Sequence, residues 1–137
     1  MGYFQVNTTC SKCDSNCSEC VGTSKTCKSC ISNYFLDTTY SLCVPSCQPG
    51  FFANALSMIC TPCTAPCATC EGLSTHCITC NLNFYLLNNT CPSSCPERVY
   101  VANSLTGRCD VCSSNCLTCS GSISTCLTCN NSAGLYF

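Results

Sequence analysis

Cysteine spacing constrains this chain more than any other feature of its sequence. The 137 residues include 22 cysteines, well above the roughly 8–10% that marks a disulfide scaffold in a short secreted chain. The spacing C-x2-C-x3-C-x2-C-x6-C-x2-C begins at Cys10, at Cys60 and again at Cys109. These starts lie 50 and 49 residues apart, so the sequence repeats one small structural unit.

The phase of the repeat predicts the domain boundaries. Gly2-Tyr3-Phe4 precedes Cys10 as Gly50-Phe51-Phe52 precedes Cys60, so residues 1–9 match the end of a preceding repeat. Complete repeats are expected over residues 10–59 and 60–108, and an incomplete third repeat over 109–137. We therefore expect the chain to be a section of a longer array.

Composition leaves little material for an ordinary hydrophobic core. Much of the 46% apolar fraction is cysteine, and the other apolar residues are scattered without helical periodicity. No apolar run is long enough for a membrane-spanning helix or a signal peptide. A repeat of about 50 residues buries too little surface to fold by burial alone. The expected class is small and disulfide-rich, with little or no helix and a minimal core.

The paired cysteines fit three kinds of chemistry. Zinc sites use C-x2-C pairs, but the pairs in such sites stand farther apart than the three or six residues found here, or have histidine partners. Redox catalysis needs one distinguished C-x2-C pair with a lowered thiol pKa, whereas every pair here repeats alike. A disulfide framework accounts best for the repetition. We expect neither metal nor cofactor.

Connectivity does not follow from spacing, because eight cysteines allow 105 pairings. The cysteine run, followed by an aromatic pair such as Tyr34-Phe35, then C-x3-C and a Pro-Gly-Phe-Phe segment, resembles the furin-like cysteine-rich repeat. That repeat is found in growth-factor-receptor ectodomains, R-spondins, proprotein convertases and large protist surface proteins. The resemblance implies an elongated tandem array of these repeats with short β-hairpins.

The resemblance also implies a disulfide pattern. In that family the second cysteine bonds the fourth, the third bonds the fifth, the sixth bonds the seventh, and the eighth bonds the first of the next repeat. The implied pairs are Cys13–Cys20, Cys17–Cys27, Cys30–Cys43, Cys47–Cys60, Cys63–Cys70, Cys67–Cys77, Cys80–Cys91, Cys95–Cys109, Cys112–Cys119 and Cys116–Cys126. Cys10 and Cys129 remain, and we expect them to pair with cysteines outside this segment or between chains.

Short hairpins are expected between the cysteines. Residues 33–37 and 40–44 flank one polar turn, and residues 81–87 and 90–91 flank Asn88-Asn89, whose side chains tolerate the left-handed conformation of a tight turn. Residues 51–53 and 58–60 suggest a further hairpin. Glycines two residues after the fourth cysteine of each copy are expected at positive φ; these are Gly22, Gly72 and Gly121. The aromatic pairs are expected to cover disulfides.

Sequons and cysteines together predict passage through the secretory pathway to the cell surface or beyond. The N-x-[ST] acceptors for N-linked glycans are Asn7, Asn16, Asn88 and Asn130. Asn88 is the best candidate because of its turn. Asn16 is the weakest, because the middle residue of its sequon must form a disulfide.

No catalytic constellation is evident, so we do not expect an enzyme. His76 has no nucleophile partner and occupies a loop position held by Thr26 and Thr125 in the other copies. The formal net charge of −1 and the absence of a basic run argue against nucleic acid and against an anionic membrane surface as partners. The short apolar runs argue against membrane insertion of this segment. Three lysines of the first repeat form a small basic group, expected to be solvated; these are Lys12, Lys25 and Lys28.

Two functions remain from different classes. The first is a non-catalytic structural module, a glycosylated rod in a surface coat, matrix or filament, whose partners are further repeats of the same chain and, by assembly, a homo-oligomer or fibre. The second is a ligand-binding ectodomain of a receptor or secreted signalling protein. The second predicts an exposed aromatic or charged cluster in one repeat that its siblings lack.

Overall fold

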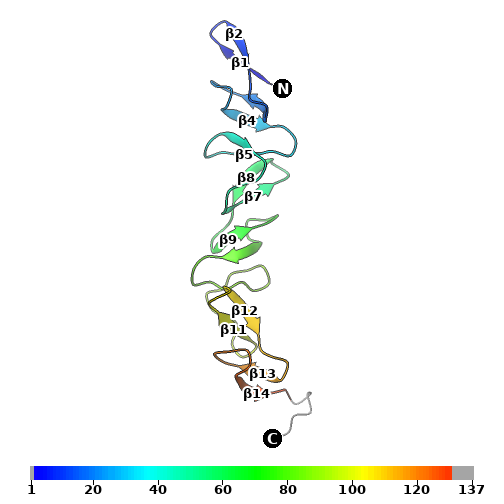
Figure 1. The fold of residues 1–137 in the computed structure, drawn as a ribbon, viewed down its shortest axis with the longest axis vertical. Helices are drawn as coiled ribbons and strands as arrows, with labels where there is room; N and C mark the ends of the chain where they lie inside the picture. Colours follow the sequence, from blue (N-terminus) through cyan, green and yellow to red (C-terminus); the bar gives the residue numbers. More distant parts are fainter. Residues whose placement is uncertain (1, 131–137) are drawn as a thin grey trace. The chain divides into compact units, whose positions relative to one another are not determined.

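Every regular element in the part of the chain that the structure describes, residues 2–130, is a short β-strand (Figure 1). The structure is a computed structural model, and its strands have three or four residues each. The predicted fold class, a tandem array of small disulfide-rich units with short hairpins, is confirmed. Contacts divide the chain into two compact units, residues 1–64 with 69–74 and residues 65–68 with 75–137.

One kind of antiparallel hairpin, which we call the entry hairpin, leads into each cysteine run. In each one, the first cysteine of the run lies on the second strand, opposite Gln5, Ala53 or Ala102. Of the residues 51–53 and 58–60 expected to pair, all but Met58 do so in slightly longer strands, and Met58 lies in the turn. The three are β1 (Tyr3–Val6) with β2 (Thr9–Lys12), β7 (Phe51–Asn54) with β8 (Ile59–Pro62), and β11 (Tyr100–Asn103) with β12 (Arg108–Val111).

The cysteine run itself forms a second kind of hairpin, the cysteine hairpin, which the sequence did not predict. Each of its strands begins and ends with a cysteine, because a C-x2-C unit is one four-residue strand long. The glycines expected at positive φ lie just beyond the first strand, with φ of 70, 72 and 75°. The pairs are β3 (Cys17–Cys20) with β4 (Cys27–Cys30), β9 (Cys67–Cys70) with β10 (Cys77–Cys80), and β13 (Cys116–Cys119) with β14 (Cys126–Cys129).

The third predicted hairpin differs between the two repeats. In the first repeat β5 (Phe35–Asp37) pairs with β6 (Leu42–Val44), within the predicted ranges. In the second repeat the predicted turn at Asn88-Asn89 is present, but the predicted strands over 81–87 and 90–91 are wrong. The pairing there is an isolated bridge between Leu87 and Thr90 and one further backbone bond, from the Tyr85 N–H to the Pro92 carbonyl at 3.0 Å. The cysteines of this segment are 11 residues apart, against 13 in the first repeat. The two missing residues fall in the turn, which is Asn88-Asn89 here and residues 38–41 in the first repeat. Pro92, at the position of Val44, has no N–H to donate, so the pairing does not extend into a ladder.

Parallel pairing joins this third segment to the next entry hairpin. In the first unit Leu36 pairs with Ile59, giving a four-stranded sheet in the order β6-β5-β8-β7, and the Leu36 N–H donates to the Met58 carbonyl at 2.9 Å. In the second unit the Leu86 N–H donates to the Gly107 carbonyl at 2.8 Å. The same connection therefore occurs twice, 50 residues apart.

The core consists almost wholly of cysteine side chains. Among residues 2–130, the buried apolar side chains are cysteines except for Phe52, which is 8% exposed. Asp37 is the buried polar residue, 6% exposed, and no buried side-chain nitrogen or oxygen in this range lacks a hydrogen-bond partner. The predicted minimal core is confirmed.

Candidate functional site

Disulfides are the chemistry that the structure brings together. Ten bonds are formed, and each is a pair that the resemblance implies. Their Cα–Cα distances of 5.0–5.7 Å fall in the normal range for a disulfide. The bonds are Cys13–Cys20, Cys17–Cys27, Cys30–Cys43, Cys47–Cys60, Cys63–Cys70, Cys67–Cys77, Cys80–Cys91, Cys95–Cys109, Cys112–Cys119 and Cys116–Cys126.

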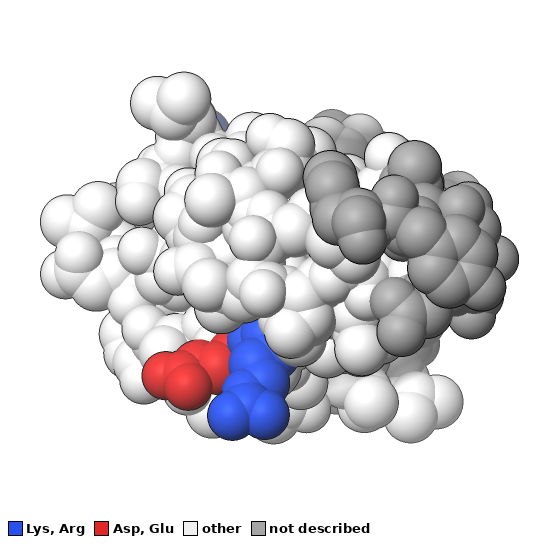
Figure 2. Space-filling view, turned by 90° about the horizontal axis from the view of Figure 1, so that it is seen from below, with Lys and Arg blue, Asp and Glu red and all other residues white. Residues whose placement is uncertain are grey.

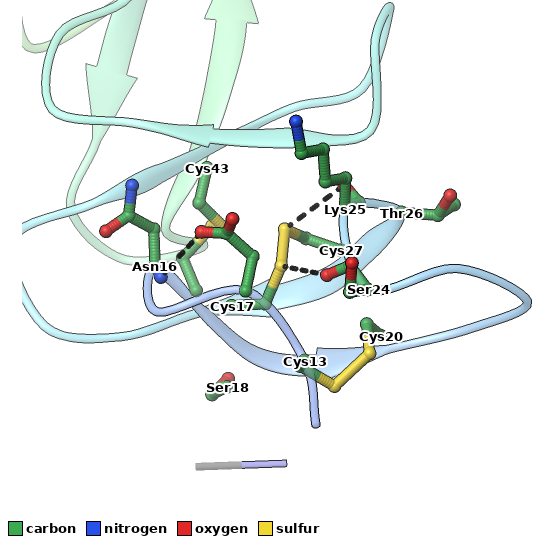
Figure 3. Close-up of a disulfide and its surroundings, with 12 residues drawn as sticks. Cys13, Asn16, Cys17, Ser18, Cys20, Ser24, Lys25, Thr26, Cys27 and Cys43 are labelled. Atoms are coloured by element: carbon green, nitrogen blue, oxygen red, sulfur yellow. Dashed lines mark hydrogen bonds between the residues drawn. A yellow bond between two sulfur atoms is a disulfide. The ribbon is translucent and has the colours of Figure 1, made fainter. Parts of the chain in front are cut away.

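The Cys17–Cys27 bond lies at the centre of the first repeat (Figure 3). Cys17 is 0% exposed, and its Sγ lies 3.7 Å from the Ser24 carbonyl oxygen, while Cys27 Sγ lies 3.6 Å from the Lys25 carbonyl oxygen. A disulfide sulfur carries no hydrogen, so these are packing contacts of sulfur against carbonyl groups rather than hydrogen bonds. The loop of the cysteine hairpin thus closes over the bond.

Three sulfur atoms crowd together in this repeat, those of Cys17, Cys27 and Cys43, within 4.8 Å of one another. Such a cluster resembles a metal site by distance alone. All three cysteines are in disulfides, however, and metal binding by cysteine requires thiolates. The three sulfur atoms belong to two neighbouring disulfides, and Tyr34 packs against the buried cysteine cluster that includes them. The prediction that the aromatic pair covers a disulfide is confirmed for Tyr34.

Asp37 fixes the third hairpin of the first repeat to the segment before β7. Its carboxylate accepts hydrogen bonds from Gln48 Nε2 at 2.8 Å and from the Thr39 N–H at 2.9 Å. Burial acts to raise the pKa of Asp37, but the hydrogen bonds from Gln48 and Thr39 outweigh it, so the pKa is lowered. The second repeat has Leu87 at this position, and sequence patterns gave no signal for the Asp37–Gln48 pair.

Cys10 and Cys129 form no disulfide within the described residues. Cys10 is exposed on β2, at the position where Cys60 and Cys109 receive the eighth cysteine of the repeat before them. Cys129 is half-buried at the end of β14, where Cys30 and Cys80 bond a seventh cysteine. Both keep the strand positions of their bonded counterparts.

The other sequence candidates divide by exposure. Asn7 and Asn88 are exposed at turns, whereas Asn16 and Asn130 are half-buried. His76 is exposed, as expected for a loop residue. The three lysines of the first repeat, Lys12, Lys25 and Lys28, are exposed as well.

A groove in the second unit has a volume of about 680 Å³ and is lined in part by Tyr85, Glu97, Arg98 and Tyr100. Arg98 has a φ of 79°, and its carbonyl accepts a hydrogen bond from the Cys119 N–H at 3.1 Å. No sequence motif marks this groove. The available signal was length, because 13 residues separate Cys95 from Cys109 while 12 separate Cys47 from Cys60.

Comparison with known proteins does not assign a family. No family model matches the chain, and no curated protein matches it. The structural features, namely cysteine-rich repeats built of strands alone, with paired small hairpins held by disulfides, fit a furin-like type of repeat. The described residues contain no helix of the length and hydropathy that a membrane span requires.

Proposed function

We propose that this chain is a non-catalytic structural module of the furin-like type, exposed outside the cell within a longer repeat protein. The observation that carries the proposal is the connection between successive modules, which occurs twice with the same parts. Each connection combines a parallel backbone contact with the disulfide between the eighth cysteine of one repeat and the first cysteine of the next. A module joined to its neighbours in this way is a unit of a linear array.

The same connecting surface is open at the first entry hairpin. β8 and β12 each carry a bonded cysteine and a parallel neighbour, Leu36 or Leu86. β2 has the equivalent cysteine, Cys10, exposed and unbonded within the described residues. The partner that fits this strand is another repeat, which would supply a segment like that around Leu36 and an eighth cysteine like Cys47. The array would then extend by one repeat at a time.

Disulfide density and surface composition support a location outside the cell. Ten disulfides are expected to persist in an oxidising compartment and not in a reducing cytosol. Only 8% of residues are charged, and on the face shown in Figure 2 uncharged residues predominate, with basic and acidic side chains side by side at one place. A surface of this kind offers no strong field for steering a charged partner.

The array hypothesis is tested by supplying the missing repeat. Residues 10–59 are inserted once more directly before Cys10, which places a second Cys47 ahead of Cys10 as Cys47 stands before Cys60. The insertion adds eight cysteines. If the surface of β2 accepts the inserted repeat, the number of free thiols stays at the two now present, as measured by alkylation without reductant followed by intact mass.

The matched control carries Cys47→Ser in the inserted copy only, and it should show one additional free thiol. Four free thiols in the unmutated insertion would sink the array hypothesis. Intact mass of the original chain with and without reductant tests the framework itself, because each bridge adds two hydrogens on reduction. If the chain instead holds zinc that a chelator removes, and shows no mass gain on reduction, the cysteines are metal ligands and the disulfide framework is wrong.

A second candidate function, ligand binding, has one observation in its favour. The groove with Glu97 and Arg98 lies in the segment between Cys95 and Cys109, which has one residue more than the segment between Cys47 and Cys60. Gln48-Pro49 stand at the corresponding place in the first repeat. An oligosaccharide array probed with the chain and with a Glu97→Gln, Arg98→Gln variant tests it. Binding that the variant loses would favour a receptor role, and identical profiles would exclude recognition of these glycans at this groove.

A further inference from the structure

The four sequons occupy two different kinds of structural position. Asn7 and Asn88 each stand at the first residue of a two-residue turn, with φ of 52 and 47°. Asn16 lies directly before the cysteine hairpin, and Asn130 directly after one. We propose that Asn7 and Asn88 carry N-linked glycans and that Asn16 and Asn130 do not, an inference that rests on the export included in the proposed function.

In the turn at Asn88-Asn89 the two asparagines have different roles: Asn89 is hydrogen-bonded to the cysteine hairpin, and Asn88 is exposed. Asn89 is tied to Cys77, since the Cys77 N–H donates to the Asn89 carbonyl at 2.9 Å and Asn89 Nδ2 donates to the Cys77 carbonyl at 3.2 Å. Thr90 Oγ1 donates to the Leu87 carbonyl at 2.7 Å. These bonds hold the turn in place, while the Asn88 side chain makes no hydrogen bond within the described residues. Its amide is exposed at the apex.

The turn at Asn7 repeats this arrangement on a different hairpin. Thr9 Oγ1 donates to the Val6 carbonyl at 3.0 Å, the same bond across the turn that Thr90 makes. Gln5 Nε2 donates to the Asn7 carbonyl at 3.0 Å, so the bond is to the backbone and the Asn7 amide makes none within residues 2–130. Asparagine also suits these turns because it tolerates positive φ.

Space for a glycan at Asn7 follows from the other two entry hairpins. Their turns carry Leu56 and Leu105, each 99% exposed, although each hairpin already contacts the preceding segment through Leu36 or Leu86. The tip of an entry hairpin therefore stays in solvent when the preceding module is in place. A glycan on Asn7 would leave the array connection at Cys10 open.

The other two sequons are less accessible in the folded chain. In Asn16-Cys17-Ser18, the Asn16 side chain is half-buried and Cys17 is fully buried in its disulfide. Asn130 is half-buried, and its Nδ2, the atom that a glycan would modify, donates to the Ser114 carbonyl at 3.3 Å. Residues 131 and 132 of that sequon lie outside the described residues.

The modification is a glycosyl transfer from a lipid-linked diphosphate oligosaccharide. The asparagine Nδ2 forms a bond to the anomeric carbon and releases one proton to a base. The bond from that carbon to the diphosphate oxygen breaks, and the lipid diphosphate leaves with the electron pair. Neither oxidant nor reductant is needed, and one amide hydrogen remains on Nδ2.

The experiment expresses the chain behind a secretion signal in a eukaryotic cell. Occupied sites are mapped by peptide-N-glycosidase in heavy-oxygen water, which converts each glycosylated asparagine to labelled aspartate. We expect label at Asn7 and Asn88 only, and loss of label at one site in each of Asn7→Asp and Asn88→Asp. Aspartate suits the turn because it also tolerates positive φ. Thr9→Ala and Thr90→Ala should abolish the same sites by a second route.

Asn16→Asp and Asn130→Asp are the matched controls and should leave the glycan mass unchanged. Sites are mapped on secreted and on cell-retained chain alike, so poor folding of a variant does not hide the result. Label at Asn16 or Asn130, or none at Asn7 and Asn88, overturns the inference. A secreted chain with ten bridges and no glycan would do so while leaving the proposed module standing, whereas a chain without the bridges contradicts the proposed function itself.

Discussion

The first two repeats share a cysteine framework and differ in what fills it. Both have four disulfides in the same order. The first adds the β5–β6 hairpin, the Asp37–Gln48 bond and a buried Phe52. The second has one bridge at Leu87, no buried acid, and half-buried Val101 at the position of Phe52. The disulfides, the two kinds of hairpin and the parallel connection are common to both repeats, whereas these additional noncovalent contacts differ between them.

The largest expected effect comes from removing the disulfide between the sixth and seventh cysteines of a repeat, which is Cys30–Cys43 in the first and Cys80–Cys91 in the second. Loops of 13 and 11 residues predict a loss of about 3 kcal/mol in either case. Hydrogen exchange should then show a different loss of amide protection in the two repeats. After Cys30→Ala with Cys43→Ala, residues 35–44 should keep part of their protection through β5 and β6. After Cys80→Ala with Cys91→Ala, residues 84–91 should lose it. Equal loss in both would break the comparison.

Phe52→Ala and Val101→Ala compare the two entry hairpins. Phe52 is the single buried apolar side chain other than cysteine among residues 2–130, so its truncation should destabilise by about 3 kcal/mol. Val101 packs half-buried against the cysteines of the third repeat, and its truncation should have an effect of about 1 kcal/mol. Denaturant unfolding of both variants measures the difference. A larger effect at Val101 would mean that the second unit depends more on apolar packing.

Acid should weaken the first repeat at a position where the second has no titrating group. The pKa of Asp37 is lowered from its ordinary value of 3.8. The stability it contributes is therefore fully present above that value and lost as pH falls through the lower folded value. Hydrogen exchange of residues 35–44 between pH 5 and pH 2 should show this. Asp37→Asn should remove the pH dependence of that segment, and a persistent dependence would assign it to another carboxyl.

The smallest expected effect is at the hairpin tips. Leu56 and Leu105 are each 99% exposed, and the backbone of each tip is held by Asn54 or Asn103, whose Oδ1 accepts two backbone N–H groups. Leu56→Ser and Leu105→Ser should change stability by less than about 0.5 kcal/mol. Thermal unfolding provides the measurement. A clear loss of stability in either variant would reveal packing of that tip against another part of the chain.

How much the sequence predicted depends on how far apart the interacting residues are. The period, the turn glycines and the entry hairpin around Phe51 follow from short-range spacing. The cysteine hairpins were missed because a C-x2-C unit has no apolar alternation to mark a strand. The strands predicted over 81–87 show the opposite error. The turn at Asn88-Asn89 does form, but the pairing beside it stays short because Pro92 has no N–H to donate to a longer ladder.

By itself, the sequence determined that this protein repeats and that cysteine, rather than an apolar core, holds each repeat. These properties depend on composition and on intervals along the chain. Only the tertiary structure decided the parallel connection at Leu36 and Leu86, the Asp37–Gln48 bond, and the difference between Asn7, exposed at a turn, and Asn130, half-buried beside a hairpin. The physical reason is that hydrogen bonding and exposure depend on which residues distant in the sequence come into contact. Cysteine spacing alone does not specify those contacts, because they depend on which disulfides form.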